Sequence, residues 1–187
     1  RYDNKYSIKD KKLSNVFKSI VCKGHIVGFH PSYHSFNDRS QFYKEKKLLE
    51  KVSGTTIATG RQHYLKFSVP NTWRIWEDNN MLVDSTMGYS ECAGFRCGTG
   101  DGFKVFDVCN RIELKLVEYP LIFMDATYRD RLSEEETFNI VKFFIDVSKK
   151  YRMDMVILFH NSVLYNGFNM DMKNLYLKVL KELRECR

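Results

Sequence analysis

Short apolar runs alternate along the chain with longer segments whose apolar residues recur every three or four positions. Apolar residues at that spacing line one face of a helix, whereas a short continuous apolar run is typical of a buried strand. Helices are predicted over residues 7–23, 38–52, 70–76, 133–151 and 171–185, and strands over 25–29, 55–59, 81–83, 113–124 and 155–159. Buried strands that alternate with amphipathic helices are typical of a parallel sheet with helices packed outside it, so the pattern predicts an α/β fold.

Residues that favour helix ends support several of these boundaries. Ser7, with Asp10 three residues later, is a candidate N-terminal cap for the first helix, and Gly24 follows its end. Ser133 is followed by three glutamates, which predicts a capping box at the start of the fourth helix. The glycine-rich segment 94–102 is predicted to be a loop.

Five predicted strands end at a polar or ionisable side chain. In parallel α/β folds, the residues that carry function lie at the carboxyl ends of the strands. If the strands are parallel neighbours, their last side chains converge on one edge of the sheet. The residues at these ends are His30, Arg61, Asp84, Asp125 and His160.

Composition and charge narrow the class of protein. The 187 residues suffice for one domain, and 43% hydrophobic and 14% aromatic residues argue against disorder. No apolar run is long enough to span a bilayer, so no transmembrane segment is expected. The net charge of +7 would suit an anionic partner, but the lysines at 9–12 and 44–47 are interleaved with acidic residues, which favours solvated helix faces. The sequence has no helix-turn-helix, zinc-finger or RNA-binding pattern, so we expect no nucleic-acid partner.

The five cysteines form no CxxC pair, and their odd number argues against a closed disulfide framework. Free thiols favour a reducing compartment such as the cytoplasm, although a signal peptide upstream of Arg1 is an alternative. The sequence also lacks the phosphate-binding GxxxxGK[ST] loop, the GxSxG elbow and the HExxH helix. The nucleotide-binding and hydrolase classes that use these motifs are therefore not indicated.

Two histidines four residues apart form the first candidate metal site. If the segment turns helically after Pro31, the imidazoles of His30 and His34 point to one side and can bind one divalent ion. A catalytic metal normally takes three protein ligands and a water, so the pair is not a complete site. The alternative is a loop with two ordinary histidines. His25, at the start of its strand, is expected to be structural.

Four motifs occur in a recognisable order along the chain. They are His30-Pro-Ser-Tyr-His34, Arg61-Gln-His-Tyr64, Asp84-Ser-Thr-Met-Gly-Tyr89 and Leu158-Phe-His160. In this order they resemble the later motifs of NodB-type polysaccharide deacetylases, over about residues 24–162. The resemblance is nearest to divergent members with His-Pro-Ser-Tyr and Arg-Gln-His-Tyr, found in bacterial surface-polysaccharide settings. It implies a partial, distorted (β/α) barrel with parallel strands and outer helices.

The resemblance also implies a metal site. His30 and His34 match the two metal-binding histidines of the family, although Pro31 stands where the family has Ser or Thr. The implied cofactor is a divalent metal, Zn²⁺ in the first instance. A bound ion of this kind polarises an acetamide carbonyl and lowers the pKa of its water.

Three further residues match groups around the reacting carbonyl. Arg61 matches the arginine that orients the catalytic base, and Tyr64 matches the tyrosine whose backbone N–H stabilises the oxyanion. Asp84 matches the first aspartate of the motif that buttresses the arginine, but the second aspartate and the tryptophan of that motif are absent. His63 replaces the usual proline.

His160 matches the general acid that protonates the leaving amine. The alternative for this residue is a strand-end histidine that is hydrogen-bonded to backbone. Tyr33, Tyr89 and Arg96 are candidate substrate contacts. For the segment around Arg96, however, a plain glycine-rich connection is the preferred interpretation.

One part of the family pattern is missing. The Asp-Asp motif, which supplies the general base and the third metal ligand, has no counterpart, so we expect residues 1–187 to be a single deacetylase-like domain lacking its first strand or strands. On this view, an upstream strand ending in Asp-Asp or Asp-x-Asp precedes Arg1. Asp125 is the only other strand-end carboxylate, and it either faces the same edge or serves a turn or cap.

The sequence therefore favours one function and leaves a second open. The first is metal-dependent hydrolysis of N- or O-acetyl groups on a polysaccharide or glycan precursor. The alternative is a catalytically inactive, deacetylase-like module that binds glycan or acts as a scaffold, with aromatic residues such as Tyr33, Tyr64, Trp73 and Tyr89 against sugar rings.

Overall fold

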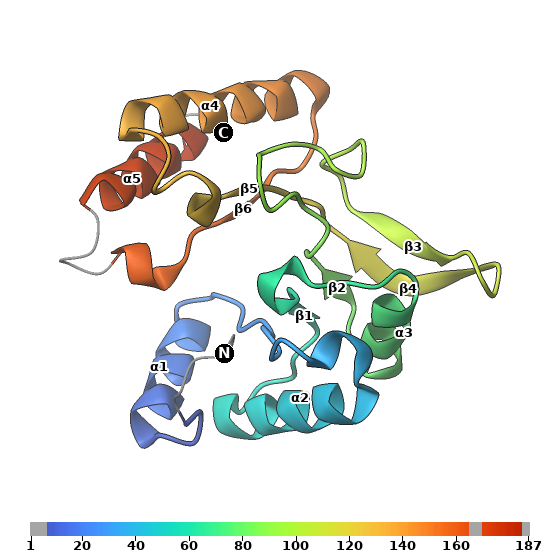
Figure 1. Cartoon of the computed structure of the whole chain (residues 1–187). Coiled ribbons are helices and arrows are strands. Elements are labelled where there is room, and N and C mark those ends of the chain that lie inside the picture. The colour runs from blue at the N-terminus through green and yellow to red at the C-terminus, as the bar shows by residue number, and fades with distance from the viewer. Residues whose placement is uncertain (1–6, 165–169, 185–187) are drawn as a thin grey trace. The chain divides into compact units, whose positions relative to one another are not determined.

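The computed structural model describes residues 7–164 and 170–184, and the chain divides into two compact units (Figure 1). Each unit combines parallel strands with helices, so the α/β class predicted from the alternating pattern is confirmed. The units are Arg1–Thr86 with Phe103–Glu118 (unit 1) and Met87–Gly102 with Tyr119–Arg187 (unit 2).

The sheet of unit 1 has the strand order β1-β2-β4-β3. The pairs β1/β2 and β2/β4 are parallel, whereas β3 runs antiparallel to β4. Asp84 lies opposite Glu118 in the β2–β4 register, which makes the carboxyl ends of these two strands neighbours. The strands are β1 (Thr59–Gly60), β2 (Val83–Asp84), β3 (Phe103–Asp107) and β4 (Ile112–Glu118).

The strands differ from the sequence prediction in extent and in pairing. The predicted strands 55–59 and 81–83 each share only their last residue with the observed β1 and β2. The predicted strand 25–29 contributes only an isolated parallel bridge beside β1. The stretch 113–124 is divided near Pro120 into β4 and β5 (Leu121–Met124), which belong to different sheets, because proline has no N–H to donate to a ladder. Strand β3 has no counterpart in the prediction, and its residues alternate between buried and exposed only in the structure, because Val105 and Phe106 are both apolar and Asp107 is buried.

Local capping groups fix the helices of unit 1. Asp10, and not Ser7, caps the first helix by accepting a 2.9 Å hydrogen bond from the Lys12 N–H. Asp38 caps the second, which Gly54 ends in a left-handed conformation (φ 71°). The helices are α1 (Lys11–Cys22), α2 (Arg39–Ser53) and α3 (Asn71–Asp78). Fully buried core side chains of unit 1 include Phe42, Ile57, Trp76, Met81 and Leu116.

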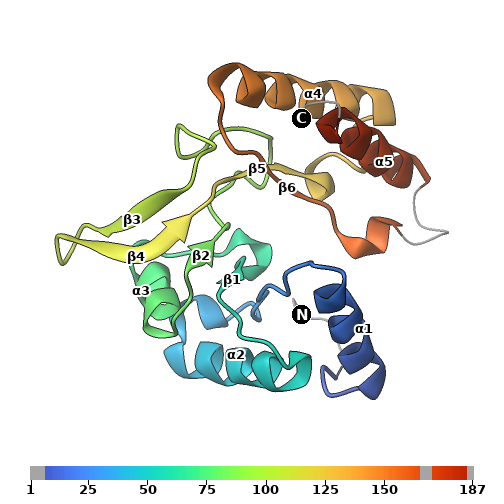
Figure 2. The same cartoon turned by 180° about the vertical axis from the view of Figure 1, so that it is seen from behind.

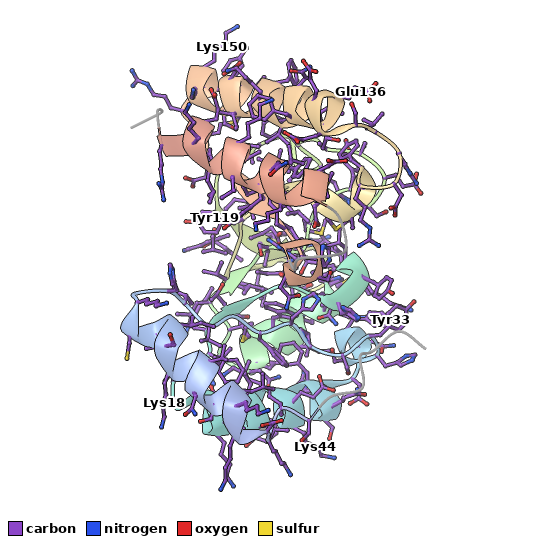
Figure 3. All side chains as sticks on the ribbon, turned by 90° about the vertical axis from the view of Figure 1, so that its left-hand side faces the viewer. Lys18, Tyr33, Lys44, Tyr119, Glu136 and Lys150 are labelled. Atoms are coloured by element: carbon purple, nitrogen blue, oxygen red, sulfur yellow. The ribbon has the colours of Figure 1, made fainter. Side chains whose placement is uncertain are left out.

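The surface lysines show where the positive charge lies. Lys18 on α1 and Lys44 on α2 point away from their helices into solvent (Figure 3). Lys46 departs from the predicted solvated face, because it is 4% exposed and its Nζ lies 2.8 Å from the Glu50 carboxylate. Hydrogen bonds from Lys46 and Lys47 lower the pKa of Glu50 to about 2.

Unit 2 pairs two parallel strands, β5 and β6 (Val156–Leu158), with two helices. Helices α4 (Glu134–Tyr151) and α5 (Met170–Arg184) lie side by side in Figures 1 and 2. The predicted capping box of Ser133 is confirmed, and Figure 3 shows acidic Glu136 and basic Lys150 at opposite ends of α4, as the helix dipole favours. The core of this unit consists of Phe123, Phe138, Val141, Ile145, Met172, Leu175 and Val179.

No helix within residues 7–164 and 170–184 has both the length and the hydropathy needed to cross a bilayer.

Candidate functional site

A backbone bridge beside β1 positions the first histidine. The Phe29 N–H donates to the Thr59 carbonyl (2.8 Å), and the Arg61 N–H donates to the Phe29 carbonyl (2.9 Å). The approach requires glycine at position 60, because a Cβ there would lie 2.2 Å from the Phe29 oxygen. This bridge brings the residues that follow it, His30 and Arg61, to the same place.

The His30 ring has a hydrogen-bond partner at each nitrogen. Nδ1 lies 2.8 Å from the Arg61 carbonyl oxygen, and Nε2 lies 2.9 Å from Nδ1 of His63. A carbonyl can only accept, so Nδ1 of His30 carries the proton and its Nε2 presents a lone pair. His63 is then the donor between the two rings, which stand nearly perpendicular (86°) with centroids 4.8 Å apart.

The loop from His30 to His34 is anchored at its centre. Ser32 donates to the Glu45 carboxylate through its backbone N–H (2.9 Å) and its hydroxyl (2.6 Å). The Ser35 hydroxyl donates to the Ser32 carbonyl (2.7 Å) and accepts from the fully buried Gln62 amide (3.0 Å). These contacts hold the predicted metal-binding loop against α2 and the end of β1.

His34 immediately precedes the 3-10 helix Ser35–Asn37, and its ring packs edge-on against Tyr33 at 5.1 Å. In the structure, the ring of His30 contacts the ring of His63, and the sequence did not predict this contact. Within the described part of the chain, no three His, Cys, Asp or Glu side chains gather closely enough to hold a metal ion.

Arg61 lies beside two buried carboxyl groups. Asp84 and Glu118 are both fully buried, and the Arg61 Nε donates to the Ser85 carbonyl at 2.8 Å. Burial and then the charge of Glu118 raise the pKa of Asp84 well above its ordinary value, although a hydrogen bond from the Thr86 hydroxyl opposes this. Burial also lowers the pKa of Arg61, against the effect of the two carboxyl groups. Arg61 is thus the cationic side chain next to two buried carboxyl groups, whose charges favour its protonated form.

Tyr64 has an unusual backbone conformation. It has φ 57° and ψ 20°, and Leu65 follows with φ 51°, so two consecutive non-glycine residues adopt left-handed angles. Such strain is concentrated at functional sites. The Tyr64 ring is 62% exposed and makes edge-on contacts with His63 (4.6 Å) and Tyr33 (5.7 Å). Lys66 completes the cluster, because its Nζ lies 4.1 Å from the Tyr33 ring centroid.

A cavity of about 400 Å³ opens next to the paired histidines. Its polar lining includes His30, His63 and Glu45, and its apolar lining comes largely from α1, α2 and the bridge beside β1. This volume falls within the range of small-molecule sites. The apolar side chains that line it are Ile8, Phe17, Phe29, Pro31, Leu48 and Leu49.

Unit 2 contains a separate carboxylate–histidine pair. Asp125 follows β5 and is fully buried, and its Oδ1 lies 2.5 Å from Nδ1 of His160, which follows β6. The same carboxylate accepts from the backbone N–H groups of His160 (2.9 Å) and Ala126 (2.8 Å). The His160 side chain is 40% exposed, so Asp125 fixes one ring nitrogen inside while the ring edge reaches solvent. Asp125 thus combines the predicted turn role with a contact to His160.

Two candidate substrate contacts also lie together in unit 2. Arg96 donates to the Gly88 carbonyl (2.8 Å), and its guanidinium lies 5.9 Å from the centroid of the Tyr89 ring. Gly94 lies directly beside that ring, since a Cβ there would meet it at a van der Waals distance of 3.4 Å. The glycine-rich segment therefore also packs Arg96 against Tyr89.

Two contacting residues, Glu118 beside Asp84 and His63 beside His30, were not predicted from the sequence, for different reasons. Glu118 is in phase with the buried Leu114 and Leu116 along β4, so the two-residue period was a signal for a buried carboxylate. His63 lies on a 3-10 turn, and such a turn has no periodicity that would point its ring at His30.

Comparison with known proteins gives structural relatives only. No family model and no curated protein sequence matches the chain. A protein assigned as a polysaccharide deacetylase from Mycobacterium smegmatis matches with a TM-score of 0.62 and 15% identity, over 90% of this chain and 61% of that one. A second protein so assigned, from Pseudomonas aeruginosa PAO1, matches with a TM-score of 0.62 and 14% identity, over 90% of this chain and 57% of that one. The structure of Puue allantoinase matches with a TM-score of 0.62 and 11% identity, over 94% of this chain and 58% of that one.

The chain thus spans about three fifths of the length of these structures. Two of them carry the deacetylase assignment that the motifs resemble. At such identities the likeness shows the fold alone. This chain has the α/β fold of deacetylase-type proteins, with parallel strands and surrounding helices.

Proposed function

We propose that residues 1–187 form one deacetylase-like domain of a hydrolase that removes N- or O-acetyl groups from a glycan. The observation that carries the proposal is the His160 side chain, which is partly exposed and held at Nδ1 by the buried Asp125 carboxylate. The fold shared with proteins assigned as polysaccharide deacetylases supports the reaction class. Surface polysaccharide is the substrate class that the motif resemblance favours.

His160 is proposed to protonate the leaving amine or alcohol. With Nδ1–H directed at Asp125, the opposite nitrogen, Nε2, is the one that exchanges a proton with substrate. The buried carboxylate also holds the ring in one orientation, so that Nε2 keeps a fixed direction. The pair therefore has the arrangement that a general acid needs.

The proposed cofactor is a divalent metal, Zn²⁺ in the first instance, with His30 and His34 as ligands. His30 fits this role. Metal-binding histidines usually donate the N–H of their second ring nitrogen to a carbonyl or carboxylate oxygen, and Nδ1–H of His30 donates to the Arg61 carbonyl oxygen. A bound zinc ion would supply Lewis acidity toward the acyl carbonyl.

The remaining proposed roles belong to groups around the acyl carbonyl and the sugar. Arg61, which lies beside the buried Asp84 and Glu118, is proposed as a positioning residue for the catalytic base. The strained Tyr64 backbone supports a role for its N–H as the oxyanion donor. The proposed sugar contacts are Tyr33, Tyr89 and Arg96.

The test is hydrolysis of a chemically acetylated or N-acetylated oligosaccharide by the full chain supplied with Zn²⁺. We expect His160→Ala to lower kcat by about 10²-fold or more with a smaller change in KM, because loss of a general acid affects the transition state. His25→Ala is the matched control, since His25 is exposed and has no proposed role. Acetate release that is unchanged by His160→Ala would contradict the proposal.

A second function is favoured by a specific observation. The described residues contain no three-ligand metal cluster, and Tyr64 and Tyr89 present exposed rings. These features support a glycan-binding module without catalysis. In that case the chain would bind the oligosaccharide, Tyr64→Ala would weaken binding, and no acetate would be released with or without Zn²⁺.

A further inference from the structure

The contact between His30 and His63 has the geometry of a split metal site. Nε2 of His30 and Nδ1 of His63 are 2.9 Å apart, joined by one hydrogen bond. Two imidazole nitrogens bound to the same tetrahedral zinc, each at about 2.0–2.1 Å, lie about 3.3 Å from each other. To bind one ion, the two nitrogens would have to move apart by a few tenths of an ångström, and each ring would have to turn so that its lone pair points at the ion.

The tautomers of the two rings are suited to this exchange. Nε2 of His30 already presents its lone pair, because Nδ1–H is engaged by the Arg61 carbonyl. His63 needs only to carry its proton on the other ring nitrogen, Nε2, to present a second lone pair from Nδ1. A cation between the two lone pairs replaces the proton that now bridges them.

The backbone fixes both rings before any ion arrives. His30 directly follows the Phe29–Gly60 bridge, and His63 lies on the turn between buried Gln62 and strained Tyr64. Ligands held in this way lose little freedom on binding. Both rings also line the cavity of about 400 Å³, which leaves space for water or a substrate group beside the ion.

We propose that His63 is a metal ligand and binds a divalent ion together with His30. The motif resemblance places a proline at position 63 and assigns the ligand role to His34, so this ligand is particular to the chain. The inference rests on the proposed function in that it concerns the same metal site. Imidazole nitrogens favour Zn²⁺, Cu²⁺ and Ni²⁺ over Mg²⁺ and Ca²⁺.

The experiment is calorimetric titration of the full chain with Zn²⁺ alone, at neutral pH, with histidine side-chain ¹H–¹⁵N spectra as a second readout. We expect His30→Ala and His63→Ala each to weaken Zn²⁺ binding at least about tenfold, as loss of a direct ligand should. The spectra should show Zn²⁺ shifting Nε2 of His30 and Nδ1 of His63. His25→Ala is the matched control, and circular dichroism of each variant verifies folding.

The variants separate this inference from the proposed function. Loss of binding in His63→Ala, whether or not His34→Ala also loses it, supports His63 as a ligand. Loss in His30→Ala and His34→Ala, with His63→Ala unchanged, overturns the inference and leaves a metal-dependent hydrolase in place. Absence of Zn²⁺ binding by the unmodified chain overturns both the inference and the metal dependence.

Discussion

The two units present the same strand-end residue in opposite settings. Asp84 in unit 1 and Asp125 in unit 2 are both fully buried at the end of a strand. Asp84 faces a second carboxyl group, Glu118, and its pKa is raised. Asp125 instead accepts two backbone N–H groups and the ring of His160. The partner therefore decides the setting: Asp84 belongs to a buried cluster with Glu118 and Arg61, whereas Asp125 orients the partly exposed His160.

The largest effect is expected from Asp125→Asn, which removes the charge from the unit 2 pair. Under the proposed function we expect kcat to fall by about 10²-fold or more, because an amide, which can donate as well as accept, no longer fixes the Nδ1–H tautomer of His160. The measurement is acetate release against substrate concentration and pH. Asp130→Asn, at an exposed aspartate, is the control. Wild-type kcat in Asp125→Asn would show that Asp125 only closes a turn.

A smaller effect, on stability, is expected when the close approach of the Gly60 and Phe29 backbones in unit 1 is blocked. Gly60→Ala would place a Cβ 2.2 Å from the Phe29 oxygen, so the bridge must open. We expect the free energy of unfolding to fall by about 2–3 kcal/mol in urea titrations. Gly28→Ala is the matched control, because its Cβ would meet its nearest atom at an ordinary 3.5 Å. Equal stability of the two variants would contradict the close approach.

Glu118→Gln removes the second carboxyl group beside Asp84, so that Asp84 would have an uncharged neighbour in its place. The pKa of Asp84 is higher in the folded chain than in the unfolded chain, so its proton stabilises the fold below the ordinary aspartate pKa. That stabilisation is lost as pH rises through the folded pKa. Without the neighbouring charge the pKa should fall, and the loss of stability between about pH 5 and about pH 8 should shrink by about 1 kcal/mol.

Urea unfolding at the two pH values measures this difference. Glu113→Gln, at a glutamate whose side chain is 59% exposed on the same strand, is the control and should leave the pH dependence unchanged. A pH dependence that is the same in Glu118→Gln and in the unmodified chain would mean that the two carboxyl groups do not interact.

The smallest effect is expected from Ser133→Ala. This substitution alters the N-terminal cap of α4 in unit 2 and leaves Asp125 and His160 unchanged. Loss of the capping box should lower the free energy of unfolding by about 1 kcal/mol. The hydrolysis rate per folded molecule should not change. A parallel fall in kcat would show that stability of unit 2, and not the orientation of His160, limits the activity in the aspartate variant as well.

The local sequence predicted the elements better than their pairing. The helices at 38–52 and 133–151 were correct to within a residue or two, because capping groups and apolar faces act over a few neighbouring residues. The strand over 113–124 was wrong as a single unit, since its two halves pair in different sheets. The catalytic, substrate-binding and metal-binding roles assigned to individual residues all stay predictions.

The sequence by itself determined the alternation of helices and strands and the polar residues at the strand ends, because spacing and capping are local properties. Only the tertiary structure decided which side chains meet. His30 contacts His63, Asp84 lies opposite Glu118, and Asp125 binds His160, each across more than thirty residues of chain. The surroundings of a buried carboxyl group are set by such partners, so the local sequence could not distinguish Asp84 from Asp125.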